Sequence, residues 1–174
     1  MEDTPVSIIG IIIASIIMFV VPLTLLADRN DDIAQLVIQT HTAEFVDTVI
    51  KTGKITVEQY ENFMKSLETS GNNYDIDFEI KVLDPNPAQY ATNNSGGNPG
   101  ANAYYSIFTS QVEDQLQSNG ELILKDGDEI YVTVRNNSQT LSQTLKSFYY
   151  TIAGDDLYIL SSTSSGTIAI NGAT

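Results

Sequence analysis

Apolar residues follow two different patterns along this chain of 174 residues. Between Val6 and Leu26 they form one run without a charged residue, and the polar stretch DRNDD comes directly after Ala27. At about 1.5 Å per residue, this run would be roughly 30 Å long as a helix, which is the thickness of the hydrocarbon core of a bilayer. The pattern predicts a single membrane-spanning helix that carries a soluble domain.

From Ile33 to Ile50 the apolar residues recur every three or four positions, which is the spacing of an amphipathic helix. No strong helix breaker separates this segment from the apolar run, so we expect one long helix that ends at Gly53. Pro22 lies inside the apolar part and lacks a backbone N–H, and a kink is therefore predicted there.

The rest of the chain predicts shorter elements. Thr56 and Gln59 form a capping-box pattern at the start of a second helix. Strict alternation of apolar and polar residues from Tyr74 to Val82 predicts a strand with one buried face. The stretch from Asp84 to Asn102 contains three prolines and no apolar periodicity, so a long, mobile surface loop is expected there.

The pattern is less regular after this loop. A third helix is expected from Tyr104 to Gln117, and Asp126 and Gly127 form a turn signal that predicts a hairpin between two strands. Ser138 would cap a fourth helix. The strands of the hairpin and of the chain end are expected at 122–124, 130–135, 149–153, 157–161 and 163–170.

Together these elements predict an α+β fold, in which a long N-terminal helix carries a small antiparallel sheet of about four or five strands with short helices on it. The expected domains are the tail and membrane-spanning helix at 1–27, the amphipathic extension at 28–53 and an extracytoplasmic α+β domain at 54–174.

Charge and composition narrow the possible surroundings. The formal net charge of −14, from 22 acidic and 8 basic residues, argues against a nucleic-acid partner and against peripheral binding to anionic lipid. The absence of cysteine and the abundance of Asn, Ser, Thr, Gly and Tyr favour an extracytoplasmic domain. We therefore expect a single-pass cell-membrane protein with its C-terminal domain outside. The sparse Lys and Arg residues favour the opposite orientation weakly, and a cleaved secretory signal is the alternative to a retained helix.

Few residues suggest catalytic chemistry. His41 is the only histidine, no cysteine is present, and neither a G-x-S-x-G motif nor a P-loop occurs. We expect no enzymatic activity, no cofactor and no metal. The acidic residues Asp75, Asp77 and Glu79 could collect a hard cation together with Asp84, but the solvated face of a half-buried strand explains them more simply.

The apolar run contains a pattern suited to helix association. Gly10 and Ala14 are four residues apart, and small residues at this spacing let two membrane helices approach closely. With Ser7 and Pro22 they form the predicted packing interface. The amphipathic segment would continue it as an assembly stripe, which consists of Ile33, Leu36, Val37, Ala43, Val46 and Ile50.

The chain resembles type IV pilin-like proteins in four features. These are the sequence PLTLL at the end of the apolar run, the acidic stretch DRNDD after it, the helix that continues beyond this stretch and the acidic C-terminal domain. More narrowly, it is similar to the TadE-like minor pilins and related small membrane proteins of Tad-type pilus loci in Gram-positive bacteria. The resemblance implies a non-enzymatic subunit that joins other pilin-like subunits in a pilus or secretion filament, with a role in adhesion or secretion. The short MEDTP start and the absence of an acidic residue within the run favour an accessory component over a major pilin.

A rival hypothesis comes from another class of protein. In it, the chain is a monomeric membrane-tethered binding module. The loop from Asp84 to Asn102 and the neighbouring Tyr90, Tyr104 and Tyr105 would then contact a surface or a ligand.

Overall fold

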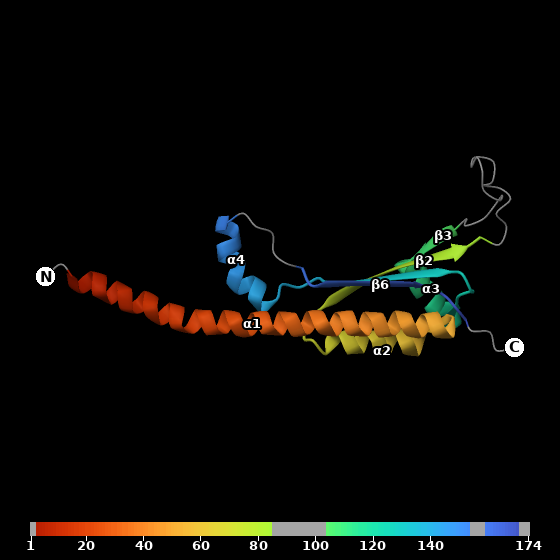
Figure 1. Cartoon of the computed structure of the whole chain (residues 1–174), viewed down its shortest axis with the longest axis horizontal. Coiled ribbons are helices and arrows are strands. Elements are labelled where there is room, and N and C mark those ends of the chain that lie inside the picture. Colours follow the sequence, from red (N-terminus) through yellow and green to blue (C-terminus); the bar gives the residue numbers. More distant parts are fainter. Residues whose placement is uncertain (1–2, 85–103, 154–158, 171–174) are drawn as a thin grey trace, which may run out of the picture.

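The computed structural model describes residues 3–84, 104–153 and 159–170, and it has the α+β architecture expected from the sequence (Figure 1). A helix of 50 residues, α1 (Asp3–Thr52), runs along the molecule. Its C-terminal half lies against an antiparallel sheet, whereas its N-terminal half extends past the domain. The apolar segment and the domain are therefore joined by one continuous helix, as predicted.

Local chemistry determines the shape and the end of α1. Pro22 lies inside the helix without ending it, and Figure 1 shows the N-terminal half of α1 curving away from the line of its C-terminal half. Gly53 follows the helix with φ of 66°, and its N–H donates to the carbonyl of Val49 at 2.8 Å. This left-handed conformation favours glycine and stops α1 at the predicted place.

Four strands form the main sheet, in the order β3-β2-β5-β6, and all neighbours are antiparallel. They are β2 (Tyr74–Leu83), β3 (Tyr104–Phe108), β5 (Glu129–Asn136) and β6 (Ser161–Thr167). Two short strands, β1 (Lys54–Thr56) and β4 (Glu121–Ile123), pair with each other in a second sheet. The strand predicted from alternation is confirmed as β2, in which Phe78 and Ile80 are buried and Asp75 and Asp77 are exposed.

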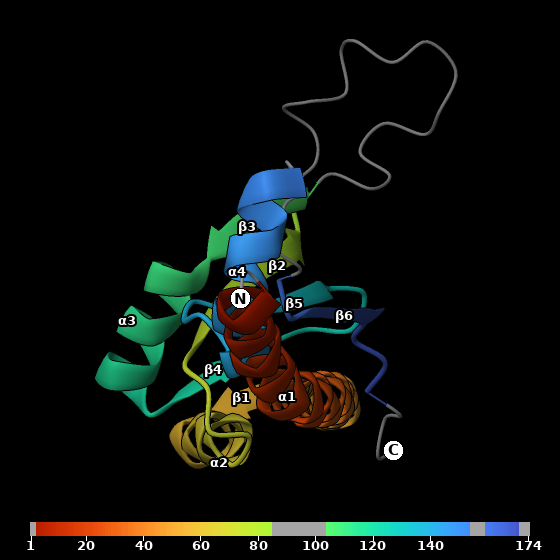
Figure 2. The same ribbon diagram turned by 90° about the vertical axis from the view of Figure 1, so that its left-hand side faces the viewer.

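Within the described residues, three short helices accompany α1, namely α2 (Val57–Glu68), α3 (Thr109–Asn119) and α4 (Leu141–Ala153). The predicted capping box of α2 is present, because the Thr56 hydroxyl accepts from the N–H of Gln59 at 3.2 Å and the Gln59 amide oxygen accepts from the N–H of Thr56 at 2.9 Å. Figure 2, viewed from the N-terminal end, shows α2 beside α1 and α4 projecting from α1.

The hydrophobic core lies between α1, α2 and the sheet. Phe45 of α1 stacks on Phe63 of α2, with ring centroids 4.5 Å apart, and meets the edge of Phe78 of β2 at 5.9 Å. Around these rings lie buried aliphatic side chains, including those of Ile38, Val46, Val49, Ile80, Ile130, Val132 and Val134. Burial of this apolar surface is what holds the C-terminal half of α1 on the domain.

The strand β6 has the unusual sequence SSTSSGT, and its packing against α1 explains the small residues. A Cβ atom on Gly166 would lie 2.3 Å from Cδ1 of Ile50 in α1. Because Gly166 has no side chain, the strand approaches the helix this closely without displacing the end of the Ile50 side chain.

One expected helix begins later than predicted. Residues 104–108 of the expected third helix form β3, which pairs with the free edge of β2, and the helix α3 begins only at Thr109. The Thr109 hydroxyl accepts from the N–H of Phe78 at 2.8 Å, at the point where the chain leaves the sheet. Aromatic and β-branched residues suit this edge position, and tertiary pairing overrides the helical spacing. Phe108, the last residue of β3, is 55% exposed.

The predicted hairpin at Asp126 and Gly127 is wrong. A turn is present, but β4 pairs with β1 and β5 pairs with β2 and β6. The Asp128 carboxylate accepts from the N–H of Lys125 at 2.7 Å and from the N–H of Leu83 at 2.9 Å. The turn thus links two sheets.

The fourth helix differs from the prediction at both ends. Thr140 caps it instead of Ser138, because Thr140 and Gln143 exchange two hydrogen bonds of 2.9 and 3.2 Å. The helix continues to Ala153, so the strand expected at 149–153 is wrong. The strand expected at 163–170 begins at Ser161 and ends at Thr167. Of the strand expected at 157–161, residues 157–158 lie outside the described residues, residues 159–160 are not in a strand, and Ser161 is the first residue of β6.

Candidate functional site

The most unusual surface of the molecule is the N-terminal half of α1. Apart from the half-buried Val20, its large apolar side chains between Val6 and Leu26 are exposed, from 43% for Leu23 to 76% for Phe19. A soluble protein rarely exposes so large an apolar surface. Within the part of the chain that the structure describes, α1 is the one helix long and apolar enough to span a membrane, by length and composition.

The predicted packing residues Ser7, Gly10, Ala14 and Pro22 all lie on this exposed part of α1. The space around Gly10 is open, since no heavy atom outside its own helix backbone lies within 4 Å of the position that a Cβ atom would take. The Ser15 hydroxyl donates to the carbonyl of Ile11 at 2.8 Å, so its polar group is satisfied within the helix. The segment is therefore compatible with an apolar surrounding.

The predicted assembly stripe is divided between two faces of α1. Val46 is 2% exposed and Ile50 packs against the core, so both hold α1 on its own domain and are not available to a neighbouring chain. Ile33 is 58% exposed and Leu36 63% exposed, and Ala43 is exposed as well. Val37 is half-buried between these faces. Because one side of α1 is buried in the core of its own domain, only the opposite side can contact a neighbouring chain.

The side of α1 that faces the domain starts earlier than the sequence pattern suggested. It carries Ala27, Ala34, Ile38, Thr42 and Phe45, all buried. The small side chains of Ala27, Ala34 and Thr42 did not stand out as apolar positions, although they follow the same spacing of three and four. We call the exposed set Ile33, Leu36 and Ala43 the outer stripe of α1.

Sequence reasoning missed the role of the acidic step that follows the apolar run. Asp28 forms an ion pair with Lys146 of α4 at 2.6 Å and accepts a hydrogen bond from Ser142. Asp31 accepts a hydrogen bond from the Thr140 hydroxyl at 2.8 Å. The four-residue spacing of Ser142 and Lys146, which places both on one side of a helix, was the available signal. The acidic step fixes α4 to α1.

The carboxylates on β2 have separate partners. Asp75 accepts from the Asn137 amide at 2.8 Å, Glu79 accepts from the Ser106 hydroxyl at 3.0 Å, and Asp77 lies 4.0 Å from Arg135. Among the described residues, no group of three or more His, Cys, Asp or Glu side chains lies close enough to hold a metal ion.

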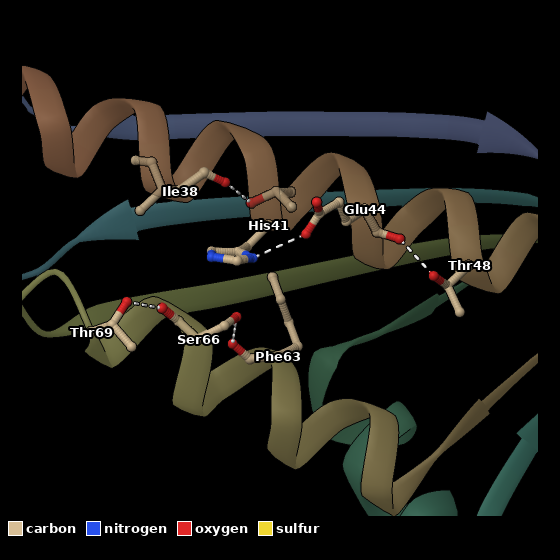
Figure 3. Close-up of polar contacts among 8 residues, drawn as sticks. Ile38, His41, Glu44, Thr48, Phe63, Ser66 and Thr69 are labelled. Atoms are coloured by element: carbon tan, nitrogen blue, oxygen red, sulfur yellow. Dashed lines mark hydrogen bonds and ion pairs between the residues drawn. The ribbon is translucent and has the colours of Figure 1, made fainter.

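A shallow hollow of about 280 Å³ lies between α1 and α2 (Figure 3). His41 Nδ1 lies 3.1 Å from a carboxylate oxygen of Glu44 at its rim, while the Thr48 and Ser66 hydroxyls donate to helix carbonyls of Glu44 and Phe63. The hydroxyl groups that Figure 3 shows here are used within their own helices. They offer no catalytic arrangement.

A larger hollow of about 590 Å³ lies on the face of the sheet turned away from α1. It is lined by residues that include Asp77, Phe108, Tyr131 and Arg135. Lys81 lies beside it, with Nζ 4.4 Å from the centre of the Tyr131 ring, and the hydrogen bond with Tyr131 raises the pKa of Lys81. This mixture of charged and aromatic side chains could contact a polar ligand.

The binding loop of the rival hypothesis lies outside the described residues apart from Asp84, and so does Tyr90. Tyr104 and Tyr105 lie on β3, where they are 37% and 52% exposed. Comparison of the chain with protein-family models, with curated proteins and with solved structures found no match.

Proposed function

We propose that this chain is a non-enzymatic pilin-like subunit, anchored in the cell membrane by one pass of α1, with its domain on the extracytoplasmic side. In this role the segment from Val6 to Leu26 lies in the bilayer. Neighbouring pilin-like subunits pack along α1 in a pilus or secretion filament. Adhesion or secretion then depends on the assembly and not on catalysis by this chain.

The observation that carries the proposal is the continuity of α1 together with the two surfaces that it leaves open. Its first half exposes the apolar segment, and its second half exposes Ile33 and Leu36 on the side that the domain does not cover. Full burial of an exposed Ile or Leu side chain stabilises by about 1.5–3 kcal/mol, and Ile33 and Leu36, at 58% and 63% exposed, lack much of this stabilisation in water. A neighbouring subunit with the same helix would cover them.

The small residues of the apolar segment support lateral packing within the bilayer. Lipid gives no hydrophobic gain for bringing two helices together, so association depends on close van der Waals contact. Gly10 and Ala14 are exposed and have room for a neighbouring helix.

Single-cysteine crosslinking tests the assembly, because the chain contains no cysteine of its own. Ile33→Cys and Leu36→Cys should each give covalent dimers when membranes are treated with a short bis-maleimide. Thr48→Cys is the matched control, since Thr48 is also exposed on α1 but lies in the hollow beside α2. It should give no dimer.

Labelling with a membrane-impermeant maleimide tests the orientation. Asn62 is exposed on α2 at the open hollow beside α1, where a small reagent can reach it although a second chain cannot, so Asn62→Cys should react in intact cells that are stripped of wall. Protection of Asn62→Cys in intact cells, with reaction only after lysis, would contradict an extracytoplasmic domain.

The tethered binding module is the second candidate, and the hollow on the outer face of the sheet favours it through the exposed ring of Phe108. Equal crosslinking at Leu36 and Thr48, or none at Ile33 and Leu36, would remove the assembly proposal. The tethered module would then be the better interpretation.

A further inference from the structure

The helix α4 stands apart from the rest of the domain. In Figures 1 and 2 it rises from α1 and projects across the direction of α1, away from the sheet. The first half of α4 is fixed to α1 at Asp28 and Asp31 by Lys146, Ser142 and Thr140. Leu141 at its start is 54% exposed.

The sequence of α1 defines the position along the helix axis at which α4 is attached. Asp28 lies two residues beyond Leu26, the last residue of the apolar segment, which corresponds to about 3 Å along a helix axis. A polar contact at Asp28 therefore lies at the boundary between the apolar segment and the water-exposed part of α1. A helix that projects sideways from this point runs along that boundary.

The sequence of α4 suits such a position. Apolar residues occur at positions 141, 145, 148 and 152, which is the spacing of an amphipathic helix, and two tyrosines follow Phe148 directly. Tyrosine is enriched where membranes meet water, because its ring is apolar and its hydroxyl is polar. The polar groups of Ser142 and Lys146 are already engaged with α1.

From this placement we infer that α4 is an interfacial helix that lies in the lipid headgroup region, fixed to the spanning helix by the Asp28–Lys146 ion pair. The inference rests on the proposed membrane anchoring of α1. The apolar face of α4 enters the boundary between headgroups and acyl chains. In this position α4 sets the depth and the tilt of α1 in the bilayer. The occupant of this face is lipid and not a second copy, because the face begins where the lipid-spanning segment ends.

Lipid-depth quenching tests the inference on the full chain in phosphatidylcholine vesicles. A fluorescent probe is attached to Leu145→Cys, and the lipids carry a nitroxide either near the headgroup or near the bilayer centre. The shallow nitroxide should quench this probe more than the deep one does, since interfacial helices lie roughly 5–10 Å into the headgroup and acyl boundary. Leu141→Cys provides a second position, because its side chain is already exposed and its replacement leaves no cavity.

Two matched positions calibrate the measurement. Ile16→Cys lies near the middle of the apolar segment and should be quenched more by the deep nitroxide, whereas Asn62→Cys on α2 should be quenched by neither. If the probe at Ile16 were not quenched, the anchoring proposal itself would fail. If Ile16 were quenched while Leu141 and Leu145 were not, α1 would still be the anchor and the interfacial role of α4 would be overturned.

Dilution of the labelled chain with unlabelled chain distinguishes the two possible occupants of the α4 face, which are lipid and a second copy of the chain. Self-quenching of the Leu145 probe that disappears when unlabelled chain is added would place another chain on this helix and overturn the lipid assignment. Quenching that depends on the lipid nitroxide, and does not change with the fraction of chains that carry the probe, supports the lipid assignment.

Discussion

Lys146 Nζ lies 2.6 Å from a carboxylate oxygen of Asp28, and this pair joins α4 to the point where α1 leaves its apolar segment. The Ser142 hydroxyl donates to the same carboxylate oxygen, although Ser142 and Asp28 are 114 residues apart in the chain. Lys146 and Asp28 are both about one third exposed, at 30% and 36%, so water weakens the pair without removing it. The contact determines where α4 can point.

Lys146→Ala should loosen α4 without unfolding the domain. Loss of a partly exposed ion pair is worth about 1 kcal/mol or less, so amide exchange at 141–147 should become up to about fivefold faster. Hydrogen exchange with mass spectrometry in detergent measures this. Lys65→Ala, which removes the exposed pair with Glu61 at 3.6 Å, is the control and should leave α4 unchanged. Equal exchange in both variants would show that the Asp28 pair does not hold α4.

Gly53→Ala should destabilise the domain more than Gly71→Ala does. Both glycines have positive φ, of 66° and 78°, so both substitutions introduce the same backbone strain of about 1 kcal/mol. Only at Gly53 would the new Cβ atom meet another side chain, 2.5 Å from Cδ1 of Ile170, whereas the space at Gly71 is open. Thermal unfolding of the two variants compares them directly. Equal melting temperatures would mean that Ile170 moves aside without cost.

Tyr60 should make stability depend on pH in the alkaline range. Burial, together with a 3.0 Å hydrogen bond to Glu113, raises the pKa of Tyr60 to about 12 from 10.0. The folded state therefore holds this proton more tightly. The stabilisation is complete below pH 10 and is lost as the pH rises toward 12.

Tyr60→Phe isolates this contribution. Below pH 10 the variant should be less stable by about 1 kcal/mol, the usual worth of one hydrogen bond, and the difference should shrink at higher pH. Melting temperatures of both proteins across this range give the comparison. A difference that stays constant with pH would assign the alkaline change to other groups.

Replacing both small residues of the apolar segment, with Gly10→Leu and Ala14→Leu, should leave membrane insertion intact, because apolarity rises. It should abolish the Leu36→Cys dimer if the helices pack closely at this point, since bulky side chains hold them apart. Ile11→Leu is the matched control and should change nothing. Crosslinking that is unchanged in the double variant would show that Gly10 and Ala14 face lipid.

Local chemistry made much of this fold predictable. The uninterrupted apolar run, the left-handed glycine at 53, the capping box of Thr56 and Gln59 and the alternation along β2 all act over a few residues, so their effects can be read from neighbouring positions. The continuous helix α1, the helix α2 and the half-buried strand β2 were therefore expected in the correct places.

Strand pairing could not be read in this way. Residues 104–108 are helical in pattern but form β3, because β2 offers them an open edge. The turn at Gly127 joins two sheets instead of closing a hairpin, and Asp128 after it accepts from the N–H of Lys125 before the turn and from the N–H of Leu83 in β2. These outcomes depend on partners that lie far away in the chain.

The order of apolar and polar residues along the chain is enough to predict one long helix, apolar in its first half and amphipathic in its second, followed by an acidic α+β domain. Which side of that helix stays open depends on how the domain packs against it. Val46 and Ile50 share the helical spacing of Ile33 and Leu36, but the core takes the first two and leaves the others in solvent. Periodicity marks a helix's apolar positions, whereas the direction of the domain selects which of them are buried.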